Sequence, residues 1–224
     1  MFVKVCGTTS EEDALLAVAV GEDAVGFVLA PSPRQVAVER VRDIVTRLPP
    51  DILTVGVFRD AAPEQVVSAV HRGRLKAAQL HGHERPEDTE YVHERVPIVF
   101  KAFVAGDPAV RTAADHGADA VLLDAARPGS GRVFDWTLTE DAPVNLRLMV
   151  AGGLNPENVG SAVARINPWG VDATSGVEAA PGRKDPRLLR AFVAAARAAA
   201  PPEHEAGEDR PYDWETELLS GRDR

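Results

Sequence analysis

The 224-residue sequence contains a single cysteine, Cys6, so no disulfide can form within the chain. Disulfides are typical of secreted proteins, and their absence favours a reducing compartment, which predicts a cytoplasmic location. No apolar run approaches the roughly 18 residues of a membrane-spanning helix. The N-terminus MFVKVCG also lacks the basic segment and apolar core of a secretory signal. We therefore expect no membrane partner.

Basic residues are scarce relative to acidic ones. The 25 Lys and Arg against 34 Asp and Glu give a net charge of −9, whereas nucleic-acid binding needs a basic surface. We therefore expect no nucleic-acid partner. Residues 201–224 hold eight acidic and three basic residues, a net of −5, which leaves −4 for residues 1–200. This acidic tail is either solvated or docked through its apolar residues, which are Tyr212, Trp214, Leu218 and Leu219.

Short apolar runs alternate with segments of helical apolar spacing throughout residues 1–200. The runs that indicate buried strands are residues 2–6, 24–29, 52–58, 76–80, 97–103, 120–124, 148–151 and 170–173. The segments that indicate helices include residues 11–20, 38–48, 63–70, 156–166 and 186–199. Strand starts recur about every 25 residues, the length of one strand–helix unit.

Eight such units predict a closed (β/α)8 barrel that forms a single domain over residues 1–200, with an acidic extension over residues 201–224. The alternative, a doubly wound open sheet, usually has about five to seven strands and a Gly-rich loop after the first. No G-x-G-x-x-G motif follows the first strand here, so the barrel is preferred. In a barrel, functional residues belong at the C-terminal ends of the strands.

Several helix starts carry capping signals. Thr9 and Glu12 match the T-x-x-E capping box. Asn155 precedes a proline, which predicts a capping side chain followed by proline at the first helical position. Asp107 and Asp185 also precede prolines and predict the same arrangement.

Two residues at strand ends are candidates for proton transfer. Cys6 ends the first strand just before a helix start, whose amides would lower the pKa of the thiol and make it a usable base or nucleophile. Alternatively, Cys6 is a small buried apolar residue. Asp124 ends the sixth strand, where a partly buried carboxyl suits a general acid. Its alternative role is a cap or a loop hydrogen bond.

The loops after the seventh and eighth strands predict a phosphate site. Gly152 and Gly153 let the backbone approach a ligand, and the helix capped by Asn155 points its amides toward the same place. Ser175 and Gly176 offer similar backbone from the neighbouring strand. In barrels these two loops commonly bind phosphate, although glycines also serve simply to make tight turns.

Other polar residues at the strand ends give weaker signals. Arg34, in the loop after the second strand, has a guanidinium that can bind a carboxylate through two hydrogen bonds. Gln79 and His81 share one face of the fourth strand. His81 and His83 suggest a metal pair, but no third ligand follows the pattern, so we expect no metal. The Gly-rich loop over residues 125–136 is a candidate lid.

Lys4 has the same strand parity as Cys6, so its side chain should point into the barrel interior below the thiol. A buried lysine needs an anion. The eighth strand neighbours the first in a closed barrel, and Asp172 lies on it. We therefore predict an ion pair between Lys4 and Asp172 at the floor of the site.

Together these motifs resemble the phosphoribosylanthranilate isomerase family, the barrel enzymes of the tryptophan pathway. The motifs are K-V-C-G-T-T, D-A-V-G-F-V with S-P-R, V-G-V-F, Q-L-H-G, L-L-D with G-S-G-R-V-F-D-W, A-G-G-L-N-P-E-N-V and D-A-T-S-G-V-E, with P-G-x-K-D after it. They follow in order from Lys4 to Asp185. Thr8 departs from the aliphatic residue usual in K-I-C-G-I, and L-L-D-A-A-R-P-G-S-G is a variant of the family loop.

The resemblance implies an Amadori rearrangement of N-(5-phosphoribosyl)anthranilate to 1-(2-carboxyphenylamino)-1-deoxyribulose 5-phosphate. It implies that Asp124 is the general acid, that Cys6 is the general base and that Arg34 binds the anthranilate carboxylate. The further substrate contacts that it implies are Gln79, His81, Gly131 and Asp172. The phosphate contacts that it implies are Gly152, Gly153, Asn155, Ser175 and Gly176. The reaction needs no cofactor, because an iminium nitrogen formed from the substrate is the electron sink.

Cysteine at the end of the first strand separates this chain from the histidine-pathway isomerase and its bifunctional relative, which use two aspartates. It indicates the monofunctional anthranilate enzyme. Two other hypotheses stay open: another phosphosugar isomerase or epimerase on the same barrel, and a noncatalytic phosphosugar-binding barrel. We expect a monomer rather than a homodimer.

Overall fold

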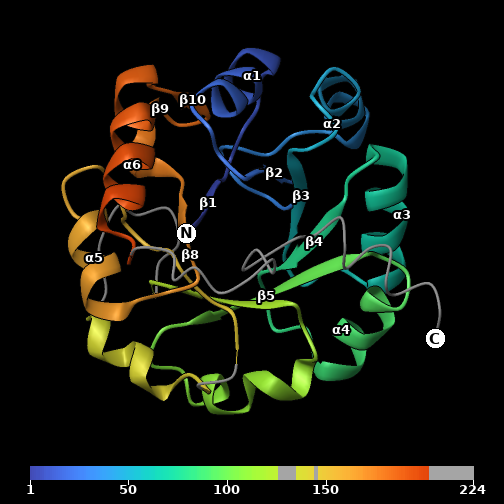
Figure 1. Cartoon of the computed structure of the whole chain (residues 1–224). Coiled ribbons are helices and arrows are strands. Elements are labelled where there is room, and N and C mark those ends of the chain that lie inside the picture. The colour runs from blue at the N-terminus through green and yellow to red at the C-terminus, as the bar shows by residue number, and fades with distance from the viewer. Residues whose placement is uncertain (126–134, 144–145, 202–224) are drawn as a thin grey trace, which may run out of the picture.

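The computed structural model describes residues 1–125, 135–143 and 146–201. Within this part, eight parallel strands close into a barrel in chain order (Figure 1). They are β1 (Phe2–Val5), β2 (Ala24–Val28), β3 (Leu53–Phe58), β4 (Ala77–Leu80), β5 (Ile98–Val104), β6 (Ala120–Asp124), β7 (Leu148–Val150) and β8 (Gly170–Ala173). Strand β8 pairs with β1, which closes the ring and places Lys4 opposite Asp172. The predicted (β/α)8 barrel is confirmed.

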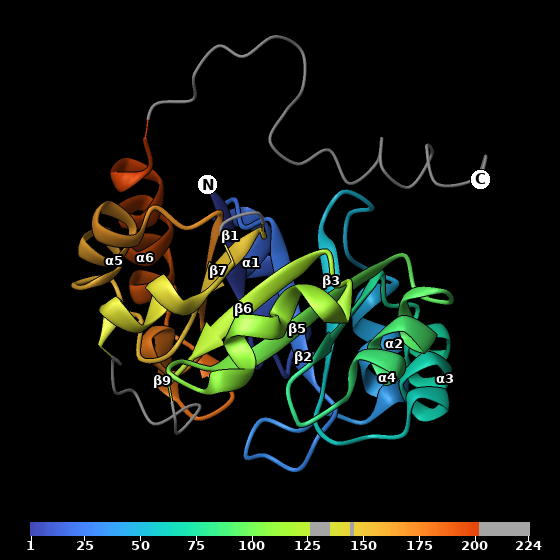
Figure 2. The same ribbon diagram turned by 90° about the horizontal axis from the view of Figure 1, so that it is seen from below.

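Helices surround the strands (Figures 1 and 2). They are α1 (Glu11–Ala19), α2 (Val38–Val45), α3 (Pro63–Gly73), α4 (Pro86–His93), α5 (Val159–Ile166) and α6 (Pro186–Ala199). The segments η1 (Pro108–His116), η2 (Trp136–Asp141) and η3 (Ser175–Val177) are 3-10 helices. Strands β9 (Glu178–Ala180) and β10 (Arg183–Lys184) form an antiparallel pair before α6. No helix in the described ranges is long and apolar enough to span a membrane.

The capping pattern differs from the prediction at two helices. Ser10, not Thr9, caps α1 and accepts a hydrogen bond from the Asp13 amide at 3.1 Å. The Thr9 hydroxyl instead donates to the Gly182 carbonyl at 2.6 Å, which ties the start of α1 to the turn between β9 and β10. Helix α5 begins at Val159, because the Asn155 side chain closes a separate turn by accepting from two following amides.

The other two predicted caps are confirmed. The Asp107 carboxylate accepts from the Ala109 amide at the start of η1, and that of Asp185 accepts from the amide of Arg187 at the start of α6. The segment after Asp107 is nevertheless a 3-10 helix with a kink at Thr112 rather than one regular α-helix.

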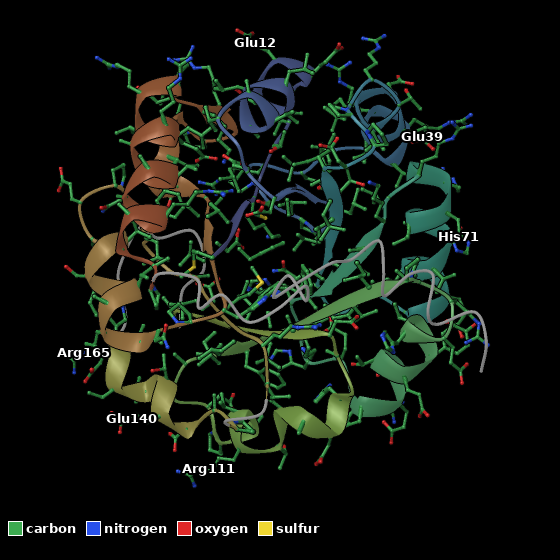
Figure 3. The ribbon with its side chains drawn as sticks, viewed as in Figure 1. Glu12, Glu39, His71, Arg111, Glu140 and Arg165 are labelled. Carbon is green, nitrogen blue, oxygen red and sulfur yellow. The ribbon has the colours of Figure 1, made fainter. Side chains whose placement is uncertain are left out.

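Apolar residues fill two layers, one inside the barrel and one between the strands and helices. Inside, Phe2 stacks on Trp169 with ring centroids 4.5 Å apart and meets Phe100 edge-on, which seals the N-terminal end of the barrel. Charged side chains such as Glu39 and Arg111 lie on the outer rim of the ring (Figure 3). Toward the C-terminal ends of the strands the inward positions become polar, so a polar cavity rests on an apolar floor.

Two of the buried ion pairs involve lysines of β1 and β5. The predicted pair is confirmed, since Lys4 Nζ lies 2.8 Å from Asp172 Oδ2. Sequence reasoning missed the second, in which Lys101 Nζ lies 3.0 Å from Glu84 Oε2. The Lys101 ammonium also donates to the Gly82 carbonyl, and Glu84 accepts from the amide of Asp60. This network fixes the loop after β4, which carries His81.

Glu22, in the loop between α1 and β2, is a buried carboxyl whose oxygens have no hydrogen-bond partner among the described residues. Burial raises its pKa well above the usual range, and Lys184 only partly opposes this effect. Folded Glu22 therefore holds its proton more tightly than the unfolded chain does. Stability must then fall as the pH rises from the unfolded pKa toward the higher folded pKa.

We predict that Glu22→Gln raises the melting temperature by a few degrees near pH 8, because it removes this cost of ionisation. The gain should disappear near pH 4, where the unfolded carboxyl is also protonated. Thermal unfolding across this pH range measures both effects. Glu90→Gln, at an exposed position in α4, is the matched control and should show no such pH dependence. A Glu22→Gln gain that is the same at every pH would contradict the account.

Candidate active site

A cavity of about 270 Å³ opens at the C-terminal ends of the strands. The predicted site residues that line it are Cys6, Arg34, Gln79, His81, Asp124, Gly152, Gly153, Asp172 and Ser175. The structure therefore brings most of the predicted site together. Asn155 and Gly176 stand directly behind the lining, and Gly131 and most of the candidate lid lie outside the described residues.

Asp124 ends β6, and each of its two carboxylate oxygens contacts a neighbouring nitrogen. Its Oδ1 accepts a 2.7 Å hydrogen bond from the Ala125 amide, and its Oδ2 lies 3.3 Å from His81 Nε2. The Gln79 amide nitrogen lies 2.9 Å from His81 Nδ1. Because an amide nitrogen can only donate, Nδ1 accepts, and the ring proton resides on Nε2, facing Asp124. Gln79 and His81 thus supply Asp124 with an oriented donor.

Cys6 is buried at the end of β1, and the predicted lowering of its pKa is wrong. Burial raises the pKa of the thiol, and the charge of Lys4 opposes that rise without cancelling it. Helix α1 begins only at Glu11, after its cap Ser10, so its amides do not act on the sulfur as the sequence suggested. The bare α-carbon of Gly26 makes room beside Cys6, since a Cβ there would lie 2.9 Å from Sγ.

Thr8, which departs from the family pattern, is fully buried. Its hydroxyl oxygen has no hydrogen-bond partner among the described residues.

Two further buried oxygens belong to residues of the cavity wall. Gln79 Oε1 and Asp172 Oδ1 have no hydrogen-bond partner in the described part of the chain. A buried acceptor without a donor is unfavourable, so each of these two oxygens carries a cost in this structure.

Arg34 reaches the cavity, and it is already paired. Its Nη2 lies 2.7 Å from Glu178 Oε2, and its Nε donates to Oε1 of the same carboxylate at 2.8 Å. Glu178 also holds Lys184 at 3.2 Å. Gly7 has a φ of +75°, and a Cβ there would lie 2.6 Å from Arg34 Cδ, so this glycine makes room for the arginine itself. Sequence reasoning missed Glu178, although it ends the motif D-A-T-S-G-V-E.

The glycines of the last two loops allow close packing. A Cβ at Gly152 would lie 2.6 Å from the Ala125 amide nitrogen and 2.9 Å from Asp124 Oδ1. A Cβ at Gly176 would lie 2.0 Å from the Leu154 carbonyl oxygen. The loop after β7 therefore touches both the candidate acid and the loop after β8, with Asn155 at the junction.

The two histidines after β4 do not form a pair. His81 faces Asp124 inside the cavity, whereas the His83 side chain is 88% exposed and lies beside Asp60. No group of three or more His, Cys, Asp or Glu residues is placed to hold a metal within the described ranges.

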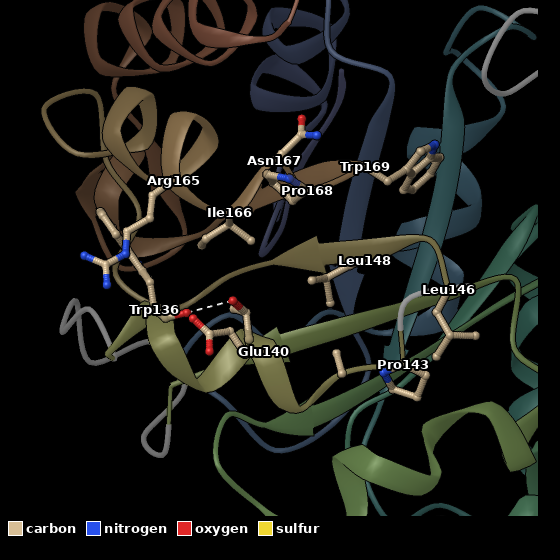
Figure 4. A pocket seen from close by; sticks show the side chains of 12 residues that line it. Trp136, Glu140, Pro143, Leu146, Leu148, Arg165, Ile166, Asn167, Pro168 and Trp169 are labelled. Atoms are coloured by element: carbon tan, nitrogen blue, oxygen red, sulfur yellow. Dashed lines mark hydrogen bonds between the residues drawn. The ribbon is translucent and has the colours of Figure 1, made fainter.

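A larger cavity of about 560 Å³ lies at the opposite end of the barrel (Figure 4). It is lined by η2 and by the residues that precede β7 and β8, among them Trp136, Leu146, Arg165 and Trp169. A hydrogen bond from the Thr139 hydroxyl to the Trp136 carbonyl closes one turn of its wall. The thiol and the carboxyl that could transfer protons are both in the smaller cavity, which is therefore the candidate active site.

The fold and this cavity place the chain among the (β/α)8-barrel enzymes that work at the C-terminal ends of their strands. The family model of N-(5'-phosphoribosyl)anthranilate (PRA) isomerase matches residues 3–195, and the chain belongs to this family. The family is an isomerase family of tryptophan biosynthesis, so the resemblance seen in the sequence motifs is confirmed.

Named relatives agree with this family assignment. The N-(5'-phosphoribosyl)anthranilate isomerase of Desulforudis audaxviator is 44% identical over 204 residues, which are 88% of this chain and 98% of that protein. The enzyme of Rubrobacter xylanophilus is 46% identical over 202 residues, 87% of this chain and 98% of that protein.

Solved structures also agree with the family assignment. The phosphoribosyl anthranilate isomerase of Thermus thermophilus superposes with a TM-score of 0.83 at 45% identity, covering 88% of this chain and 99% of that chain. Another isomerase of this name, solved with reduced 1-(o-carboxyphenylamino)-1-deoxyribulose 5-phosphate, gives a TM-score of 0.78 at 38% identity, with the same shares covered.

Proposed function

We propose that this chain catalyses the Amadori rearrangement of N-(5'-phosphoribosyl)anthranilate, with Asp124 as the general acid and Cys6 as the general base. The product is 1-(2-carboxyphenylamino)-1-deoxyribulose 5-phosphate. The observation that carries the proposal is the meeting of a carboxyl and a thiol in one cavity, from β6 and β1. A relative that binds the reduced form of this product supports it.

The acid step opens the sugar ring. Asp124 gives its proton to the ring oxygen, the bond between C1 and that oxygen breaks with its electron pair going to oxygen, and the amine nitrogen forms an iminium with C1. Asp124 is then a carboxylate in a buried place. The Ala125 amide and the Nε2–H of His81 donate to it, which stabilises the charge that the step creates.

The base step moves a proton from C2. Cys6 takes this proton, the C–H electron pair forms a double bond between C1 and C2, and the iminium electrons return to nitrogen. The resulting enolamine tautomerises to the ketone. Because the substrate's own nitrogen accepts the electrons, the chemistry requires no cofactor or metal. Each positioned proton transfer is typically worth about 10²–10⁴-fold in rate.

The cavity also offers a place for each part of the substrate. Gly152, Gly153 and Ser175 line the end that suits the phosphate, and Asn155 and Gly176 shape the loops there. Gln79 and Asp172 line the cavity, and their polar side chains suit sugar hydroxyls. Arg34 suits the anthranilate carboxylate through Nη1, which makes no hydrogen bond to the described residues. The rigid pairing with Glu178 would hold the guanidinium in place.

The oligomeric state is a separate prediction. Monomers of a dimeric isomerase of this family from Thermotoga maritima have been solved. We propose that this chain is a monomer, and its mass in solution tests this.

The fluorescence of phosphoribosylanthranilate decays as it is converted, so turnover by the purified chain tests the proposed function directly. Phosphosugar binding without decay would contradict it and favour a noncatalytic barrel.

We predict that Cys6→Ser lowers kcat by about 10²–10⁴-fold and leaves phosphate affinity unchanged, because a hydroxyl is a far weaker base than a thiolate. Normal turnover by Cys6→Ser would remove the thiol from the mechanism.

We predict that Asp124→Asn also lowers kcat by about 10²–10⁴-fold, because an amide cannot protonate the ring oxygen. Steady-state kinetics separate this from a binding role. A variant with normal kcat and a raised KM would show that Asp124 binds substrate rather than donating a proton.

A further inference from the structure

Lys4 and Cys6 lie on the same inward face of β1, and the structure places the ammonium next to the thiol. Lys4 is fully buried, and its Nζ lies 2.8 Å from Asp172 Oδ2. A Cβ on Gly26 of β2 would lie 2.9 Å from Cys6 Sγ and 3.2 Å from Lys4 Nζ. Cys6 Sγ and Lys4 Nζ therefore border the same small space, which is open because Gly26 has no side chain.

The other charged groups near Cys6 are engaged elsewhere. Lys184, from β10, donates to the Cys6 carbonyl at 2.6 Å rather than to the thiol, and it is paired with Glu178. Arg34, from the loop after β2, is held by the same Glu178. Glu22, from the loop before β2, interacts electrostatically with both lysines, and its oxygens have no hydrogen-bond partner among the described residues.

Asp172, from β8, is the remaining charge, and it binds Lys4 at 2.8 Å through one oxygen. This pairing keeps Lys4 protonated, since burial alone would favour the neutral amine. Lys4 is consequently a fixed positive charge between the Asp172 carboxylate and Cys6, which carries the only thiol of the chain.

We infer that Lys4 is a positioning residue for the base of the reaction: its ammonium, anchored by Asp172, supplies the counter-charge that makes the Cys6 thiolate attainable inside the cavity. The inference rests on the proposed role of Cys6. A buried thiolate without a counter-ion is strongly disfavoured, and a buried cysteine in apolar surroundings is inert. The charge of Lys4 is thus the feature that favours a catalytic base at Cys6 over a small core residue.

The inference gives one clear expectation for the thiol. Lys4 lowers the pKa of Cys6, so removing the lysine charge should make the thiolate rarer at a given pH. Asp172 raises the pKa of Cys6 directly but also keeps Lys4 protonated, so its removal would act in both directions and the test uses Lys4 instead.

Because Cys6 is the only cysteine, alkylation by iodoacetamide reports on this thiol alone. We predict that Lys4→Met slows alkylation at pH 8 by about tenfold or more, the effect of one pKa unit. Lys101→Met is the matched control, because Lys101 is an equally buried lysine paired with a carboxylate away from Cys6. Its alkylation profile should match that of the wild type.

Titration of the ultraviolet absorbance of the thiolate, as a difference from Cys6→Ser, gives the same pKa without requiring reagent access. Circular dichroism checks that each variant is folded. An unchanged thiol pKa in folded Lys4→Met, or an equal shift in the control Lys101→Met, would overturn the inference. These readouts do not use turnover, so a chain that fails to convert phosphoribosylanthranilate would refute the proposed function without deciding this point.

Discussion

The ion pair between Lys4 and Asp172 crosses the seam where β1 closes against β8, and the chemistry proposed for the cavity depends on it. Removing two charges from water is costly, and a buried ion pair is often no more stabilising than apolar residues of similar size. Its value here is functional. The pair fixes a positive charge beneath Cys6, and Asp172 Oδ1 has no hydrogen-bond partner within the described ranges.

The alternation of side chains along each strand places the residues of the site directly above the apolar floor of the barrel. On β1 the inward positions are Phe2, Lys4 and Cys6, which run from apolar floor to charged layer to reactive thiol. On β6 the inward positions Ala120 and Leu122 lead in the same way to Asp124. Because the strands are parallel, their polar C-terminal ends meet at one end of the barrel. The packed apolar layer separates these residues from the solvent at the N-terminal end.

Local pattern was enough to predict the eight strands and the Lys4–Asp172 pair, because both follow from strand parity and from the neighbour relation that closure imposes. It also predicted helix α6 with its Asp185 cap. Pattern failed at the capping box, since Thr9 and Ser10 have equivalent hydroxyls and only the position of Gly182 in space selects Ser10 as the cap.

Long-range partners could not be read from spacing. The contact of Arg34 with Glu178 joins groups 144 residues apart, and nothing in the local sequence of either residue encodes it. The state of Cys6 was mispredicted for a related reason. The pKa of a thiol follows the sum of burial and charge from several strands, and burial, which a single strand does not reveal, is the largest of these effects.

The central claim is that Cys6 and Asp124 act on one substrate molecule from two sides of a single cavity. A crystal structure of this chain with reduced 1-(2-carboxyphenylamino)-1-deoxyribulose 5-phosphate tests it most directly. The account predicts Cys6 Sγ about 3–3.5 Å from C2 of the sugar chain, the Asp124 carboxyl facing the former ring oxygen, and the phosphate between the loops that follow β7 and β8. A ligand bound with C2 beyond reach of Cys6, or in the cavity at the opposite end of the barrel, would contradict it.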